Sequence, residues 1–475
     1  MTDLNWNMSK KDNFFYRKLV SFKKKIALIL ENKETITYNE LLVYSEKISR
    51  KLHKKKKLVF LLGKNNLETI VGYISFISKG HAVVLLDSKI NNLFLKNLIY
   101  IYKPNYIFCD TKKKRNKSIY KSILKFKAYS LLERKVNIEI AIADDLMLLM
   151  STSGTTGSPK LVKQSYLNIF SNTKNIIKYL NIKSKDITIT TLPISYVYGL
   201  SVINTHLLAG STIVLTNSSM VEKNFWDLVN IFSVNSFSGV PYNYSIIEKI
   251  FNKNIPNSIK YTTQAGGKMN DVLLKNIIKI YKKNKIKLIQ MYGAAEATSR
   301  MSYLNWRYIS KKLGSIGKPI LGGKFYLIDS KNKKIRKNNQ KGELVYRGNN
   351  VCLGYAQKLS DLSLPDSNKG LLKTGDIAYR DNDGFYFIVG RKNRYTKIYG
   401  IRVDLSELEL ILLKKGIDTI MKEGKENKIN IYFKNSKNIK EGIKYLTKIT
   451  SINSNVFINK ILSKNNLTNN FKYKI

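Results

Sequence analysis

The chain has 475 residues, and its 83 lysines and arginines outnumber 33 aspartates and glutamates, which gives a formal net charge of +50. This length exceeds one ordinary hydrophobic core, so two or more domains are expected. No apolar run approaches the ~18 residues of a membrane span, and the polar start lacks the order of a secretory signal. We therefore expect no membrane span and a cytoplasmic protein.

The two cysteines and three histidines are too few and too scattered for a disulfide framework or a structural zinc site. The positive charge by itself would suggest nucleic-acid binding. However, the charge is spread along the chain without a basic arm, so we expect no specific nucleic acid as a partner. A nucleic-acid-binding protein stays open as an alternative of another class, and RNA binding that persists above physiological salt would favour it.

Short apolar runs alternate with helical patterns through the first 330 residues. This order predicts βαβ units, in which helices cover parallel sheets, and therefore two α/β subdomains. The expected elements are, in chain order, strands over 58–62 and 82–87 with a helix over 66–78 between them, a strand over 146–150, and strands over 187–192, 213–216 and 236–240.

The segment from Ser151 to Lys160 follows a predicted buried strand and is rich in hydroxyl side chains and glycine. Glycine allows a close backbone approach to an anion, while hydroxyls and a lysine add donors and charge. The two glycines are too close together for a Walker P-loop. The sequence thus predicts a phosphate-binding loop of another kind, with the residues Thr152, Ser153, Gly154, Thr155, Thr156, Gly157 and Lys160 as candidate ligands.

From about Gly314 the sequence changes to short strands separated by Gly, Asn and Asp turns, which predicts a small β-rich subdomain. A helix should begin near Asp404, with Glu407 three residues later and an apolar stripe ending at Gly416. A small α+β C-terminal domain is therefore expected after a short hinge near residue 392.

Several motifs, in the same order along the chain, resemble those of the adenylate-forming, AMP-binding superfamily. This superfamily includes acyl-CoA synthetases, carrier-protein-loading adenylation domains and luciferases. The matching segments are Thr37–Leu41, the phosphate-binding loop, 264–268, 291–296, 373–376, 390–391 and 397–403. The resemblance implies an N-terminal AMP-binding domain over 1–392 and a small mobile C-terminal domain over 393–475.

The resemblance also implies the nucleotide ligands. Lys160 would contact the ATP phosphates, Gly266 and Gly267 would lie flat against adenine, and Tyr292, followed by Gly293, would stack on it. Asp376 would accept hydrogen bonds from the ribose, with Arg391 nearby. Absent side chains at a glycine pair would permit contact with a planar base.

Glu296 matches the glutamate that helps the family to hold Mg²⁺, and a carboxylate beside phosphates is favourable only with a cation between them. The threonine that the family places before it is Ala295 here, and Thr298 lies close in sequence. The hinge residue is Asn393, the run 397–403 matches a strand of the family, and Gly400 would let a pantetheine arm pass.

The acid pocket is expected near Tyr196, Tyr198 and Gly239, because tyrosine offers an apolar face with one polar tip. The family's last lysine, which bridges the acid and the α-phosphate, aligns with Asn470, and an amide lacks that charge. Lys472 or Lys464 is the candidate replacement.

The implied function is an ATP- and Mg²⁺-dependent acid–thiol ligase that forms an acyl-adenylate from a carboxylic acid. The acyl group would then pass to CoA or to the phosphopantetheine of an acyl carrier protein. Lys160, Glu296 and Lys472 would act in catalysis. The alternative is a nucleotide-binding member of the same fold with weakened or lost adenylation, which Ala295 and Asn470 motivate.

Overall fold

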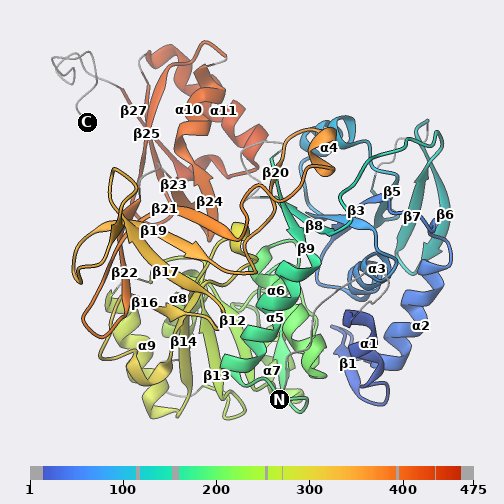
Figure 1. The fold of residues 1–475 in the computed structure, drawn as a ribbon, viewed down its shortest axis with the longest axis horizontal. Coiled ribbons are helices and arrows are strands. Elements are labelled where there is room, and N and C mark those ends of the chain that lie inside the picture. Colours follow the sequence, from blue (N-terminus) through green and yellow to red (C-terminus); the bar gives the residue numbers. More distant parts are fainter. Residues whose placement is uncertain are drawn as a thin grey trace.

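The structure is a computed structural model that describes residues 14–113, 118–151, 160–251, 255–269, 271–391, 395–413, 415–433 and 435–461. In these residues the chain alternates helices and strands around four sheets (Figure 1). The α-helices are α1 (Phe14–Val20), α2 (Tyr38–Ser49), α3 (Leu67–Ser78), α4 (Asn92–Tyr102), α5 (Tyr166–Leu180), α6 (Val197–Ala209), α7 (Lys223–Ile231), α8 (Pro241–Ile250), α9 (Asp271–Lys283), α10 (Leu405–Leu413) and α11 (Ile439–Thr450).

The first α/β subdomain is built on a sheet with the strand order β20-β9-β8-β4-β3-β5-β7-β6. Its central strands are parallel and almost entirely buried, because helices cover both faces. The predicted strands over 58–62, 82–87 and 146–150 and the helix over 66–78 all form. The strands are β3 (Leu58–Gly63), β4 (Ala82–Asp87), β5 (Tyr106–Asp110), β6 (Tyr120–Phe126), β7 (Tyr129–Arg134), β8 (Leu146–Ser151), β9 (Leu161–Ser165) and β20 (Gly354–Ala356).

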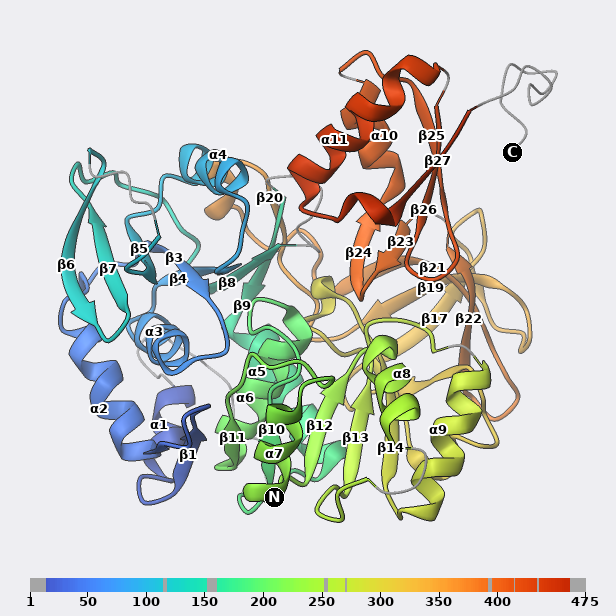
Figure 2. The ribbon, with the colours of Figure 1, turned by 180° about the vertical axis from the view of Figure 1, so that it is seen from behind.

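The second α/β subdomain has parallel strands in the order β14-β13-β12-β10-β11-β1, with β2 at the antiparallel edge. Helices α5 and α6 lie on one face of this sheet, and α8 and α9 lie on the other (Figure 2). The predicted strand over 187–192 is shorter, because the chain turns at Pro193 before α6. The strands are β1 (Ile26–Ile29), β2 (Thr35–Thr37), β10 (Ile187–Ile189), β11 (Thr212–Val214), β12 (Ser236–Gly239), β13 (Tyr261–Gln264) and β14 (Lys287–Tyr292).

The predicted β-rich subdomain forms, but it is continuous with the second sheet. Antiparallel pairing of β14 with β15, of β15 with β16 and of β16 with β22 extends that sheet to 14 strands. The added strands are β15 (Ser302–Leu304), β16 (Ser315–Pro319), β17 (Lys324–Ile328), β18 (Lys334–Ile335), β19 (Gly342–Arg347), β21 (Leu371–Arg380) and β22 (Tyr386–Arg391). This pairing places residues near 376 beside the end of β14.

The C-terminal part has a core of its own, which includes Val403, Leu408 and Phe433. The single strand that the resemblance implies over 397–403 is instead part of a hairpin, because Tyr399 and Gly400 both have positive φ. Helix α10 begins after Asp404, whose Oδ1 accepts from the backbone N–H of Glu407 at 3.2 Å, as predicted. The strands are β23 (Tyr395–Ile398), β24 (Ile401–Asp404), β25 (Thr419–Glu423), β26 (Ile429–Phe433) and β27 (Phe457–Ile461).

The C-terminal part contacts both α/β subdomains. The side chain of Asn91, at the start of α4, donates to the backbone oxygen of Lys448 in α11 at 2.9 Å. The rings of Tyr242 and Tyr399 meet edge to face, with centroids 6.1 Å apart. Among the described residues, no helix is both long and apolar enough to cross a membrane.

Candidate active site

The predicted phosphate-binding loop joins two strands, β8 and β9, which pair antiparallel in the first sheet. Of its candidate ligands, only Lys160 is described, directly before β9 begins. The others lie outside the described residues: Thr152, Ser153, Gly154, Thr155, Thr156 and Gly157. The buried strand expected before the loop is confirmed as β8.

Lys160 and Glu296, two of the predicted catalytic residues, meet through Tyr355. The Lys160 Nζ lies over the Tyr355 ring, 3.6 Å from its centroid, and the Tyr355 hydroxyl donates to Glu296 Oε1 at 2.9 Å. Glu296 itself is buried. A cation on one face of an aromatic ring and a carboxylate at its hydroxyl are both favourable contacts. Tyr355 thus contacts both charged side chains, Lys160 at the face of its ring and Glu296 at its hydroxyl.

Glu296 lies in a short 3-10 turn, Ala295–Ala297, which begins shortly after β14 ends at Tyr292. Gln164 of β9 fixes this turn, because its Nε2 donates to the Ala295 oxygen at 2.8 Å. A Cβ on Gly293 would lie 1.7 Å from the Ser299 oxygen, so only glycine fits there. The Thr298 hydroxyl donates to the Asn350 backbone oxygen at 2.7 Å, so its proton is used in a hydrogen bond within the protein.

Tyr292 and Asp376, the predicted adenine and ribose ligands, contact each other directly. Asp376 is buried in β21, and its carboxylate accepts a hydrogen bond from the Tyr292 hydroxyl. The Asp376 backbone is also opposite Arg391 in the antiparallel pair β21–β22. The backbone of Arg391 therefore lies beside Asp376, although its side chain is outside the described part of the chain.

Gly266 and Gly267 follow β13 and lie where the C-terminal hairpin meets the N-terminal part. Gly266 has φ +81°, and a Cβ there would lie 2.8 Å from Val240 Cγ1 and 3.0 Å from the Tyr196 hydroxyl. The Nζ of Lys397, in β23, donates to the Gly266 carbonyl oxygen. Tyr196 is thus at the junction of the glycine pair and the hairpin, and burial raises its pKa to about 12.

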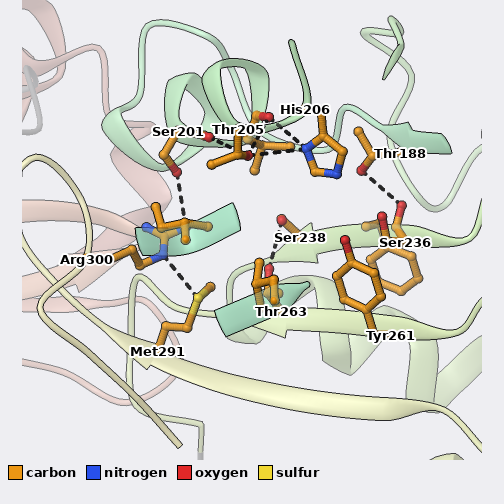
Figure 3. Close-up of a pocket in the computed structure, with 14 residues that line it drawn as sticks. Thr188, Ser201, Thr205, His206, Ser236, Ser238, Tyr261, Thr263, Met291 and Arg300 are labelled. Carbon is orange, nitrogen blue, oxygen red and sulfur yellow. Dashed lines mark hydrogen bonds between the residues drawn. The ribbon is translucent and has the colours of Figure 1, made fainter. Parts of the chain in front are cut away.

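Tyr198 and Gly239, the other predicted wall residues, are buried. The Tyr198 hydroxyl donates to the Thr263 oxygen at 2.8 Å. The Arg300 guanidinium lies over the Tyr198 ring, with its central carbon 3.8 Å from the ring centroid. Figure 3 shows the neighbouring pocket, and neither Tyr198 nor Gly239 lines it. The neighbouring Ser238 does line it, together with Arg300.

The donor set fits Mg²⁺ bound through a nucleotide. No cluster of three or more His, Cys, Asp or Glu side chains that could hold a metal occurs in the described part of the chain. Mg²⁺ is commonly held by one or two carboxylates together with substrate phosphates. Glu296 supplies one such carboxylate near Lys160, so the metal would be shared between the protein and ATP.

Sequence reasoning missed two residues of the site, Tyr355 and Arg300. Tyr355 reaches Lys160 only because β20 pairs with β9, which is remote in sequence. Arg300 follows Glu296 by four residues, and its guanidinium donates to Ser201 of α6, which is remote in sequence. Lys472 and Asn470 lie outside the described residues.

Comparison with known proteins identifies the family. The family model described as AMP-binding enzyme matches residues 15–356. The 2-succinylbenzoate–CoA ligase of Bacillus subtilis is 26% identical over 415 residues, which cover 86% of this chain and 83% of the relative. The ligase of the same name from Oceanobacillus iheyensis is 27% identical over 412 residues, 85% of this chain and 84% of the relative.

Solved structures share the fold. A double mutant of the Bacillus subtilis o-succinylbenzoate CoA synthetase, bound to a product analogue, has a TM-score of 0.79 at 22% identity and covers 97% of both chains. The complex of that synthetase with an acyl-adenylate intermediate has a TM-score of 0.69, also at 22% identity, over 97% of this chain and 96% of the other. The predicted α/β fold is confirmed. The chain belongs to the AMP-binding enzyme family, and the prediction that it is an enzyme of this family is confirmed.

Proposed function

We propose that this enzyme activates a small carboxylic acid with ATP and transfers the acyl group to CoA. The observation that carries the proposal is that Tyr292 contacts Asp376 while Tyr355 connects Lys160 to Glu296. These residues come from segments far apart in the sequence. They bring together the expected base, ribose, phosphate and metal ligands of one nucleotide.

The proposed roles follow from chemistry at each position. Lys160 neutralises charge on the ATP phosphates, and Asp376 orients the ribose. Glu296 shares Mg²⁺ with the phosphates, and this ion, when bound, would offset charge on the phosphate oxygens. Positioning and charge neutralisation are sufficient for attack of a carboxylate oxygen on the α-phosphate, so no protein nucleophile is needed.

The C-terminal hairpin supports a thiol-transfer role. Lys397 donates to the Gly266 carbonyl, and Gly400 lies close to Val240, where an added Cβ would be 3.4 Å from both methyl carbons. A glycine at this junction leaves room for a narrow substituent such as a pantetheine arm.

We also propose the boundary near residue 392 between the two domains, a cytoplasmic location, and a carrier protein as the alternative acceptor.

The acid to be tested first is 2-succinylbenzoate, for which the curated relatives are named. With ATP, Mg²⁺ and this acid we expect release of pyrophosphate, and with CoA a new acyl-CoA that mass spectrometry identifies. Lys160→Met should lower pyrophosphate release at least tenfold. Lys324→Met, at an exposed lysine of β17, is the matched control and should not.

A second candidate is a nucleotide-binding protein of this fold that has weakened or lost adenylation. Ala295 in the turn and Asn470 at the expected lysine favour it. ATP binding without pyrophosphate release for any acid of a broad panel would support this candidate and refute the ligase.

A further inference from the structure

A small polar pocket lies between helices α5 and α6 and the strands of the second sheet beneath them (Figure 3). The volume inside it that the centre of a water molecule can reach is about 10 Å³. This is about the volume that one buried water molecule needs. The pocket is therefore too small for an organic ligand, but it is large enough for a single water molecule.

Three polar atoms in the wall of this pocket are buried and have no hydrogen-bond partner among the described residues. They are Nε2 of His206 in α6, the hydroxyl of Ser236 at the start of β12 and the hydroxyl of Tyr261 at the start of β13. A buried polar atom without a partner is unfavourable, and proteins usually satisfy such an atom with an ordered water molecule.

The other polar side chains of the wall already have partners within the protein. They are Thr188, Ser201, Thr205, Ser238, Thr263 and Arg300. The Thr188 hydroxyl, for example, donates to the Ser236 backbone oxygen at 3.1 Å. The atoms that lack a partner are thus confined to one side of the pocket, around His206 (Figure 3).

The three atoms face a common space. Ser236 and Tyr261 are opposite each other in the parallel pair of β12 and β13, so their side chains project from the same face of the sheet. Figure 3 shows the Tyr261 hydroxyl directed toward the His206 ring, with Ser236 beside both. Burial raises the pKa of Tyr261 and the nearby Ser236 hydroxyl lowers it, so the two hydroxyls are close. Their contact nevertheless lacks the geometry of a hydrogen bond.

His206 contributes a hydrogen-bond acceptor to this space. Its Nδ1 lies 2.8 Å from the Val202 backbone oxygen, which only accepts, so Nδ1 carries the proton. Burial lowers the pKa of His206 to about 4, so the ring is neutral and Nε2 keeps a lone pair. A hydroxyl can donate or accept. A water molecule matches this set, because it can donate to Nε2 and to one hydroxyl while it accepts from the other.

We propose that this pocket binds one water molecule, held by His206, Ser236 and Tyr261, as a fixed part of the structure. Three hydrogen bonds are the typical number for a buried water molecule. This water would join α6 to the first residues of β12 and β13, which run from there toward Gly239 and Gly266. The inference does not depend on the proposed function, because it uses no residue of the proposed nucleotide site.

A crystal structure of the wild-type protein, at a resolution that shows ordered water, tests the proposal. We expect one water molecule within about 3.2 Å of Nε2 and of both hydroxyl oxygens. Its occupancy should fall in Tyr261→Phe, which removes one partner. The water should be lost in the double variant Tyr261→Phe with Ser236→Ala, because a buried water needs at least two polar partners.

Tyr244→Phe is the matched control, since Tyr244 is fully buried and its hydroxyl donates directly to Thr262 Oγ1 at 3.0 Å. This variant should keep the water. A wild-type pocket without a water molecule, or a water that stays at full occupancy in the double variant, would overturn the proposal.

Nuclear magnetic resonance gives a second measurement, which remains decisive if the variants do not fold. The chain has three histidines, so isotopic labelling of histidine nitrogen yields few ring signals. In the wild type, the Nε2 chemical shift of His206 should be that of an acceptor in a hydrogen bond. A chemical shift typical of a free lone pair would refute the water site.

Discussion

Tyr355 offers the sharpest test of the site, because one side chain makes two separable contacts. Tyr355→Phe removes only the hydroxyl that donates to Glu296 at 2.9 Å, whereas Tyr355→Leu also removes the ring beneath Lys160. A hydrogen bond to a charged group is worth about 1.5–3 kcal/mol. Tyr355 is 36% exposed, so water can partly replace the hydroxyl, and we take the lower value.

On this estimate Tyr355→Phe should lower kcat/KM for ATP by about tenfold. A cation–π contact at a partly exposed site adds about 0.5–1 kcal/mol, so Tyr355→Leu should lower it by a further twofold to fivefold. The assay is pyrophosphate release at varied ATP, with the melting temperature of each variant measured in parallel.

Tyr326 of β17 provides a matched control, since Lys334 Nζ lies 5.4 Å from the centroid of its ring. Tyr326→Phe and Tyr326→Leu should leave kcat/KM for ATP within a factor of two. Wild-type kcat/KM in both Tyr355 variants, with unchanged melting temperatures, would show that Tyr355 does not connect the phosphate and metal ligands.

Three further predictions concern charge. Glu296→Gln keeps an acceptor for Tyr355 but loses the negative charge, so the Mg²⁺ concentration for half-maximal activity should rise at least tenfold, and an unchanged Mg²⁺ titration would contradict the role. Asn470→Lys should raise the turnover number for pyrophosphate release, and an unaltered rate would refute the alignment of Asn470 with the family's lysine. Burial lowers the pKa of His81 from 6.5 to about 4. Between pH 4 and pH 6.5 its imidazole is therefore protonated in the unfolded chain but neutral in the folded protein. Stability attributable to His81 should be complete above pH 6.5 and fall by about 1.4 kcal/mol per pH unit down to pH 4, and the pH dependence of chemical unfolding should flatten in His81→Asn.

Much of the fold could be predicted because apolar runs and turn residues act locally. The strands β3, β4 and β8 and the helix α3 form where the hydrophobic pattern places them. The prediction of a single strand over 397–403 was wrong, since positive φ at Tyr399 and Gly400 makes a hairpin. One glycine in an otherwise β-prone run does not distinguish a continuous strand from a tight turn.

The sequence by itself determined the class of protein and the residues expected to meet the nucleotide, since these are encoded in contiguous motifs. Only the tertiary structure decided how those motifs meet: Tyr355 reaches Lys160 and Glu296 through the pairing of β20 with β9. It also decided that Arg300 is a buried cation beside α6. Burial depends on the surroundings that distant segments contribute, and no local pattern carries that information.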